Sequence, residues 1–217
     1  MRRVTAEFVT SAARGEDTPR DGLPQMALVG RSNVGKSTLI NALTHTRLAR
    51  TSATAGKTRL ANIYRIAAGQ GLTFYLVDLP GYGYARAPRQ ARGGPSSAEG
   101  RRRQATEEFE TLISGYFRLR AEGRGPDAAL MVVDARHPAL ETDVEARGWL
   151  AESAVPTVVA VNKVDKLSRA DRARMARQHA GALDAEVVEI SASRGEGLDE
   201  LWTQIARLLK NPNRPPR

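Results

Sequence analysis

Short apolar runs alternate with longer amphipathic stretches along most of this chain. The apolar runs predict strands at residues 26–29, 60–66, 72–77, 128–134, 156–162 and 185–190. Apolar positions at helical spacing predict helices at residues 38–43, 104–119, 140–150, 168–180 and 198–209. Because strands alternate with helices, we expect an α/β fold with a mainly parallel, six-stranded sheet and helices on both faces. The strands at 60–66 and 72–77 flank a Gly-Gln-Gly turn, so they predict a hairpin that adds one antiparallel edge strand.

The remaining segments predict one folded domain with less regular additions. We expect an N-terminal extension over residues 1–22, a domain over residues 23–209 and a disordered, Pro- and Arg-rich tail over residues 210–217. Within the domain, the polar residues 45–57 predict a mobile loop. Residues 86–103, which include three consecutive arginines, predict a flexible basic insertion.

The composition excludes several kinds of chemistry. The 217 residues contain no cysteine, which excludes a disulfide, a thiol nucleophile and a zinc–thiolate site. No apolar run approaches the roughly 18 residues of a membrane-spanning helix. Glu7 and Arg14 interrupt any signal-peptide core. We therefore expect a cytoplasmic protein without a membrane span.

The chain carries a formal net charge of +9, much of it from arginine. Arginine suits contacts with phosphates and base edges, so a nucleic acid is a natural partner. An arginine-rich genomic composition explains the same excess, and charge alone does not separate the two explanations.

The strongest chemical signal is at residues 30–37, whose sequence Gly-Arg-Ser-Asn-Val-Gly-Lys-Ser fits the phosphate-binding pattern G-x-x-x-x-G-K-[ST]. Gly30 and Gly35 let backbone N–H groups turn toward an anion, and the predicted helix that follows adds its positive N-terminal end. Lys36 would reach the outer phosphates, and the Ser37 hydroxyl would bind Mg²⁺. A glycine-rich turn without a ligand is the alternative.

Two further motifs end predicted strands and narrow the ligand. Residues 78–81, Asp-Leu-Pro-Gly, place an acid where it can hold water around Mg²⁺ and the Gly81 N–H where it can reach a γ-phosphate. An ordinary turn has the same composition. Residues 162–165, Asn-Lys-Val-Asp, resemble the guanine-reading motif of GTPases. Asp165 can accept hydrogen bonds from two N–H groups of guanine that adenine lacks, so adenine would leave this carboxylate unpaired. A polar strand end is the alternative.

Two weaker signals complete the set. Ser191-Ala192-Ser193 follows a predicted strand and resembles the loop whose backbone N–H groups contact the guanine oxygen of GTPases. Thr58 lies in the predicted mobile loop, where GTPases place a threonine that binds Mg²⁺ in the presence of the γ-phosphate. Thr51 and Thr54 are nearby alternatives to Thr58.

Together these motifs resemble the EngB family, also called YihA or YsxC, of bacterial ribosome-assembly GTPases. The resemblance covers about residues 23–209 and includes Gly-Lys-Thr at 56–58, Asp-Leu-Pro-Gly-Tyr-Gly-Tyr-Ala at 78–85, Val-Asp-Ala-Arg-His at 133–137, Asp143 and Trp-Leu at 149–150. It implies a Ras-like P-loop GTPase domain that hydrolyses GTP to GDP with Mg²⁺. It also implies action on a large ribosomal subunit precursor or its rRNA, with a link to cell division and septation. We expect a monomer.

The resemblance assigns roles residue by residue. The expected GTP-binding residues are Gly30, Arg31, Ser32, Asn33, Val34, Gly35, Lys36, Ser37, Gly56, Lys57, Thr58, Arg59, Leu60, Asp78, Leu79, Pro80, Gly81, Asn162, Lys163, Val164, Asp165, Ile190, Ser191 and Ala192. The expected catalytic residues are Lys36, Thr58, Gly81 and Asn33. The expected Mg²⁺ ligands are Ser37 and Thr58, with Asp78 acting through water.

The sequence departs from the family at three places: Asn162 is usually Thr, Ala55 is often Pro, and residues 86–103 are longer and more basic. Tyr82 stands where Ras-type GTPases place a water-orienting glutamine, and a phenol is no substitute for a carboxamide, so we expect slow unaided hydrolysis. Asn33 matches an asparagine that helps related GTPases bind K⁺ beside the phosphates, although it could instead only brace the loop.

Three rival functions stay open at this stage. An ATP-using enzyme such as a kinase is the first, and Asp165 argues against it. An RNA-binding scaffold without hydrolysis is the second, and a septation protein that acts without ribosomes is the third.

Overall fold

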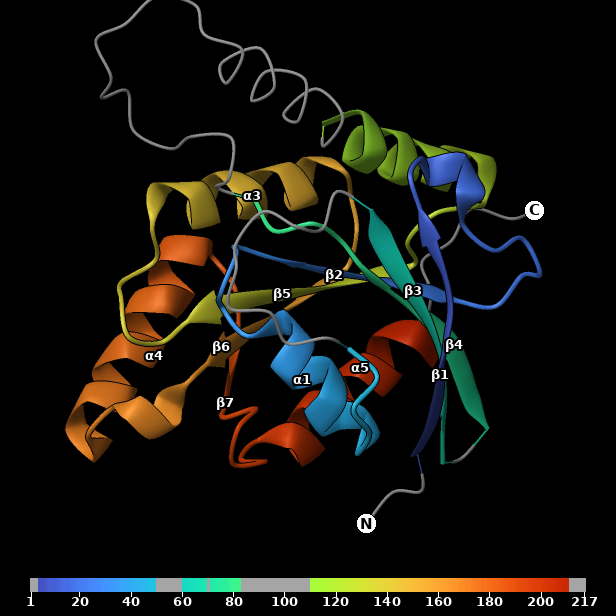
Figure 1. Ribbon diagram of the computed structural model, residues 1–217. Coiled ribbons are helices and arrows are strands. Elements are labelled where there is room, and N and C mark those ends of the chain that lie inside the picture. The colour runs from blue at the N-terminus through green and yellow to red at the C-terminus, as the bar shows by residue number, and fades with distance from the viewer. Residues whose placement is uncertain (1–3, 50–59, 70, 83–109, 211–217) are drawn as a thin grey trace, which may run out of the picture.

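The computed structural model describes residues 4–49, 60–69, 71–82 and 110–210 of the chain. A seven-stranded sheet runs through these residues in the order β1-β3-β4-β2-β5-β6-β7 (Figure 1). The strands are β1 (Val4–Ala12), β2 (Gln25–Gly30), β3 (Ala61–Ala68), β4 (Leu72–Asp78), β5 (Ala128–Asp134), β6 (Thr157–Asn162) and β7 (Val187–Ile190). The strands from β4 to β7 in this order are parallel to one another, so the predicted α/β fold with a mainly parallel sheet is confirmed.

Helices cover both faces of the sheet. On one face lie α1 (Lys36–Thr44) and α5 (Leu198–Lys210), and on the other lie the helix over residues 110–118, α3 (Glu141–Glu152) and α4 (Arg169–Leu183) (Figure 1). The shorter 3₁₀ turns are η1 (Gly15–Asp17), η2 (Leu119–Glu122) and η3 (Val164–Lys166). The central strand β2 is buried on both faces, and its alternate residues enter the two apolar layers in turn. The continuous apolar run of this strand therefore predicted its position.

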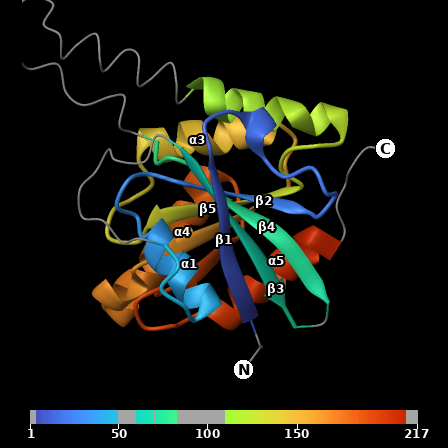
Figure 2. The ribbon, with the colours of Figure 1, turned by 45° about the vertical axis from the view of Figure 1, so that its right-hand side comes forward.

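The expected count of six strands was wrong, because residues 4–12 of the predicted N-terminal extension form the seventh strand. β1 pairs antiparallel with β3 at the edge of the sheet, as Figure 2 shows, so β3 of the hairpin is not the edge strand. Most side chains of β1 are exposed, and its ladder contains a bulge between Phe8 and Thr10. An edge strand that buries little leaves only a weak alternation in its sequence, which explains why the pattern did not reveal it.

Strand register brings the ends of the predicted motifs together. Asp134 pairs with Asn162, and Asn162 in turn pairs with Ile190, at the carboxyl ends of β5, β6 and β7. Gly30 lies beside Val132 at the same edge. Ligands of parallel α/β sheets bind outside the carboxyl ends of the strands, so the sheet places all of these motifs on one functional edge.

Several predicted segments fall outside the described residues. These are most of the predicted mobile loop (residues 50–57), the basic insertion at 86–103, the start of the helix predicted at 104–119, and all but the first residue of the tail. Within the described residues, no helix has the length and apolar character needed to cross a membrane.

Candidate nucleotide-binding site

The loop between β2 and α1 is shaped by two glycines at its ends. A Cβ on Gly30 would lie 2.6 Å from the Val132 carbonyl oxygen of the neighbouring strand. Gly35 has a φ of +103°, and a Cβ there would lie 2.5 Å from Asn162 Nδ2. Asn33 also has a positive φ of 65°. The left-handed backbone at Asn33 and Gly35 folds the loop over the first turn of α1, whose N–H groups have no partner within the helix.

Lys36 folds back over this loop. Its Nζ donates hydrogen bonds to the carbonyl oxygens of Gly30 at 2.9 Å and Arg31 at 3.4 Å. Burial lowers the pKa of Lys36, and the negative charge of Asp78 opposes that shift. The loop therefore holds the poorly hydrated ammonium group of Lys36 at its centre, where it can pair with a phosphate.

Asp78, at the end of β4, is a buried acid whose negative charge interacts with Lys36. It is 8 % exposed, and its Oδ1 accepts no hydrogen bond from any described residue. Burial raises the pKa of Asp78 to about 6, and Lys36 only partly offsets this. A carboxylate oxygen without a partner inside the protein is costly unless a ligand or an ordered water supplies a donor.

The same residues test whether Mg²⁺ fits here. Mg²⁺ prefers hard oxygen ligands and keeps several waters, and Asp78 Oδ1 and the Ser37 hydroxyl are available because neither has a hydrogen-bond partner among the described residues. No group of three or more His, Cys, Asp or Glu side chains suited to a metal occurs in the described part of the chain. The residues therefore fit a Mg²⁺ ion that also draws ligands from a nucleotide.

Asn162 joins this loop to the opposite side of the site. Its side chain is buried, with Nδ2 donating to the Val34 carbonyl oxygen at 2.9 Å and Oδ1 accepting from the Ala192 N–H at 3.0 Å. One carboxamide thus satisfies a loop carbonyl on one side and a loop N–H on the other. This side chain therefore links two loops that the strand register already brings together.

Lys163 makes a second connection to the loop. It has a positive φ of 72°, and its Nζ donates to the Asn33 carbonyl oxygen at 2.6 Å and to Asp134 Oδ2 at 2.8 Å. Burial alone would raise the pKa of Asp134, but hydrogen bonds from Arg136 and Lys163 hold it well below its usual range. Asp134 and Arg136 received no role from the sequence, although both lie in the Val-Asp-Ala-Arg-His stretch that marked the resemblance.

Asp165 is held in a fixed, charged state at the rim of the site. Ser191 Oγ donates to Asp165 Oδ1 at 2.7 Å, and Lys166 Nζ lies 3.2 Å from Asp165 Oδ2. The Ser191 hydrogen bond lowers the pKa of Asp165, burial opposes it, and Lys166 adds to the lowering. The sequence indicated only the backbone of residues 191–192 as a contact, so the hydroxyl of Ser191 is a positioning group that it missed.

The segment that follows Asp78 presses against the loop. A Cβ on Gly81 would lie 2.7 Å from the Ser32 nitrogen, and Tyr82 forms a parallel bridge with Arg31. The Tyr82 hydroxyl donates to Asp143 Oδ1 at 2.9 Å, and Arg31 Nε lies 3.2 Å from the same oxygen. Burial, together with Asp143, raises the pKa of Tyr82 far above its usual value, so the phenol remains a neutral donor. The Tyr82 hydroxyl is therefore hydrogen-bonded to α3, a contact that the sequence did not indicate.

The remaining predicted site residues fall into two groups. Leu79, Pro80, Val164 and Ile190 are buried among neighbouring residues, which leaves their backbone as the part that can face a ligand. Gly56, Lys57, Thr58 and Arg59 lie outside the described residues, and Leu60 is exposed just before β3.

Comparison with known proteins identifies the class. A family model described as "50S ribosome-binding GTPase" matches residues 25–163, and one described as "Elongation factor Tu GTP binding domain" matches residues 118–211. The fold and the site therefore define a P-loop GTPase of the ribosome-binding class.

Individual relatives narrow this class. The chain is 39 % identical over 212 residues to the probable GTP-binding protein EngB of Pelotomaculum thermopropionicum, covering 95 % of this chain and 96 % of that protein. It is 38 % identical over 214 residues to the corresponding protein of Solibacter usitatus, covering 97 % and 99 %. The chain belongs to the EngB family of GTP-binding proteins.

Solved structures agree with this assignment. The crystal structure of a probable GTP-binding protein EngB superposes with a TM-score of 0.58 at 26 % identity, over 86 % of this chain and 98 % of that one. Aquifex aeolicus Era bound to GDP and AlF₄⁻ gives a TM-score of 0.64 at 25 % identity, over 89 % of this chain and 57 % of that one.

Replacing Asn162 with Ala should weaken both the fold and nucleotide binding. The variant leaves the Val34 carbonyl and the Ala192 N–H without their partner, so the free energy of unfolding should fall by about 2–4 kcal/mol. Chemical denaturation and GTP titration measure the two effects. Thr157→Val, at the other end of β6, removes only a hydrogen bond to Val155 and serves as the control. Equal stability of the two variants would contradict the bridging role of Asn162.

Replacing Asp78 with Asn should remove the Mg²⁺ dependence of GTP binding without unfolding the protein. The lost attraction to Lys36 and the removal of a poorly solvated charge act in opposite directions, so the stability of the nucleotide-free protein should change by less than about 1 kcal/mol. GTP affinity with Mg²⁺ and with EDTA measures the effect. Asp127→Ala is the control, because buried Asp127 accepts a hydrogen bond from the Gln25 N–H and lies outside the site. It should lower stability and keep the Mg²⁺ dependence.

Proposed function

We propose that this protein is a monomeric molecular switch that hydrolyses GTP slowly to GDP and, in its GTP-bound state, acts in the cytoplasm in assembly of the large ribosomal subunit, with a link to cell division and septation. The observation that carries the proposal is the Asp165 carboxylate, which accepts a hydrogen bond from Ser191. Asn162 joins the neighbouring Ala192 to the phosphate-binding loop. A charged acceptor at that place selects guanine over adenine.

Different residues would bind the phosphates, the Mg²⁺ ion and the base of the nucleotide. Residues 30–37 hold the phosphates through backbone N–H groups and Lys36. Mg²⁺ would be held by Ser37, through water by Asp78, and by Thr58, and it would supply charge neutralisation at the outer phosphates. Lys163, whose Nζ is anchored on Asn33 and Asp134, lays its stem along the base plane.

Slow hydrolysis follows from the surroundings of Tyr82. Its hydroxyl is committed to Asp143 and cannot orient an attacking water in place of the glutamine of Ras-type GTPases. A cation beside the phosphates would replace part of the missing stabilisation of the transition state. The Asn33 side chain is exposed at the rim of the loop and is available to bind such an ion.

A ribosomal partner is supported by two independent facts. The matching family is described as ribosome-binding, and the chain carries a net charge of +9 that suits RNA. Both support the assembly role, while the link to division and septation rests on the family resemblance.

Turnover should be faster in KCl than in NaCl if Asn33 helps to bind K⁺. We expect at least about a tenfold difference at equal ionic strength, because a fixed cation stabilises charge that develops on the phosphates. Asn33→Ala should abolish this difference and leave GTP affinity unchanged. Equal rates in the two salts, with no effect of the variant, would exclude the cation.

Co-sedimentation with large-subunit precursors tests the function itself. The protein should sediment with them in the presence of a non-hydrolysable GTP analogue and not with GDP. Asp165→Asn should lose this response to the GTP analogue and regain it with a xanthine analogue, because the amide donates to the carbonyl that xanthine carries where guanine has an amine.

The rival functions predict different results in the same assay. Sedimentation that is independent of the nucleotide would indicate an RNA-binding scaffold. No sedimentation in any nucleotide state would indicate a septation protein that acts without ribosomes.

A further inference from the structure

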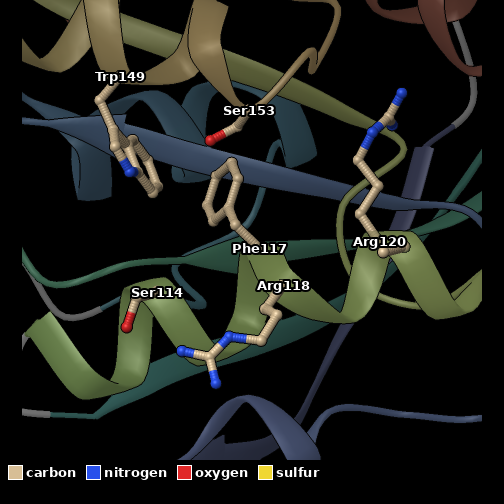
Figure 3. A pocket seen from close by; sticks show the side chains of 7 residues that line it. Ser114, Phe117, Arg118, Arg120, Trp149 and Ser153 are labelled. Atoms are coloured by element: carbon tan, nitrogen blue, oxygen red, sulfur yellow. The ribbon is translucent and has the colours of Figure 1, made fainter.

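A cleft opens between the helix over residues 110–118, with its η2 extension, and α3 (Figure 3). It has a volume of about 450 Å³ and is lined by Ser114, Phe117, Arg118, Arg120, Ala121, Trp149 and Ser153. None of the residues identified in the nucleotide site lines it. We call it the aromatic cleft.

Two aromatic rings form its apolar surface. The centroids of Phe117 and Trp149 are 4.4 Å apart, with the ring planes inclined at 59°. Phe117 is buried and packs edge-on against Tyr116, which holds its ring in place. Trp149 is only half-buried. No described residue accepts a hydrogen bond from the Trp149 indole N–H. The cleft therefore offers a rigid aromatic surface and a donor beside it.

The rim of the cleft is positive. Arg118 and Arg120 belong to the lining, and no acidic residue does. In Figure 3, Arg120 reaches up on the side of Phe117, whereas Arg118 extends from the other side of the helix. Arg120 donates to the Pro126 carbonyl oxygen at 3.2 Å and so is fixed in place. Arg118 is exposed and has no ion-pair partner among the described residues. An anionic group that approached this rim would meet no carboxylate in the lining.

The cleft is connected to the nucleotide site through α3. Asp143, in the first turn of α3, binds both Arg31 of the loop and Tyr82. Trp149 follows six residues later on the same helix, roughly 9 Å along its axis. A change in the position of Tyr82 would therefore move the helix that forms one wall of the cleft.

We propose that the aromatic cleft binds an unpaired nucleotide of RNA, with its base on Trp149, which Phe117 supports, and its phosphate at Arg118, more tightly in the GTP-bound state. Stacking on aromatic rings together with a nearby arginine is the usual chemistry of single-stranded RNA recognition. A cleft of this volume is large enough for one base and its sugar. The proposal rests on the proposed function, since it assigns the surface through which a ribosomal precursor would be held.

The two tryptophans of the chain make a direct test possible. Trp202 is buried against Phe74 on the opposite face of the sheet, so Trp202→Phe leaves Trp149 as the single tryptophan, which excitation at its long-wavelength edge distinguishes from tyrosine. Titration with a single-stranded ten-nucleotide RNA should quench Trp149 saturably, and more strongly with a GTP analogue than with GDP.

Variants then test the affinity by anisotropy of the labelled RNA. Trp149→Ala should weaken binding about tenfold or more, as expected for loss of one stacking platform. Arg118 is exposed, so Arg118→Gln should not affect folding. It should weaken RNA binding and reduce the salt dependence of the affinity by the amount expected for about one lost phosphate contact. Arg207→Gln, at an exposed position of α5 across the sheet, is the matched control and should bind as the parent does. GTP affinity should be unchanged in all three.

The outcomes separate this proposal from the function on which it rests. Absence of quenching, or wild-type RNA affinity in both cleft variants, would overturn the RNA site even if GTP-dependent co-sedimentation persists. Loss of co-sedimentation in the cleft variants without any change in RNA affinity would assign the cleft to a protein partner, and would also overturn the proposal. RNA binding at the cleft without co-sedimentation in any state would leave the RNA site standing and reject the assembly function.

Discussion

The carboxamide of Asn162 is the contact on which the rest of the nucleotide site depends. It stands at the end of β6, donates to Val34 on one side and accepts from Ala192 on the other. Its Nδ2 also lies where a side chain at position 35 would be, so the glycine of the loop is required partly by Asn162. The position of the loop then determines where Lys36 can lie, and the position of residues 191–192 determines where Ser191 holds Asp165. Phosphate and base would thus be bound by two loops that one side chain links.

Three carboxylates of the site differ in how many hydrogen bonds they accept from the protein. Asp134 and Asp165 accept hydrogen bonds from neighbouring side chains, and their pKa values lie below the usual range. Asp78 has the opposite environment, because burial raises its pKa and one of its oxygens has no partner in the described residues. The first two carboxylates are held in place by side chains of the protein itself. The third is left for groups that arrive with the nucleotide.

Much of the fold and of the site could be predicted because the relevant signals are local. A strand buried on both faces must be apolar throughout, and the motifs at 30–37, 78–81 and 162–165 are each contiguous in the sequence. The contacts made by Ser191, Lys163 and Asp143 could not be predicted, because they join residues between 26 and 130 positions apart. The aromatic cleft is hidden for the same reason. Phe117 and Trp149 each look like ordinary apolar positions of an amphipathic helix until the two helices lie side by side.

The pairing of β1 has a consequence for the order in which the sheet is completed. β1 is synthesised before β3, its neighbour in the described sheet, where Val4 pairs with Ala68 and Ala12 with Ala61. Until then β1 is an unpaired strand, and the charge of Glu7 hinders its premature association with other chains. Once β3 is available, β1 covers it from Ala61 onward, and Ser11 donates to Asn62 there at 2.8 Å. β1 therefore stays unpaired until β3, which follows α1 in the chain, has been made, and it then closes that edge of the sheet.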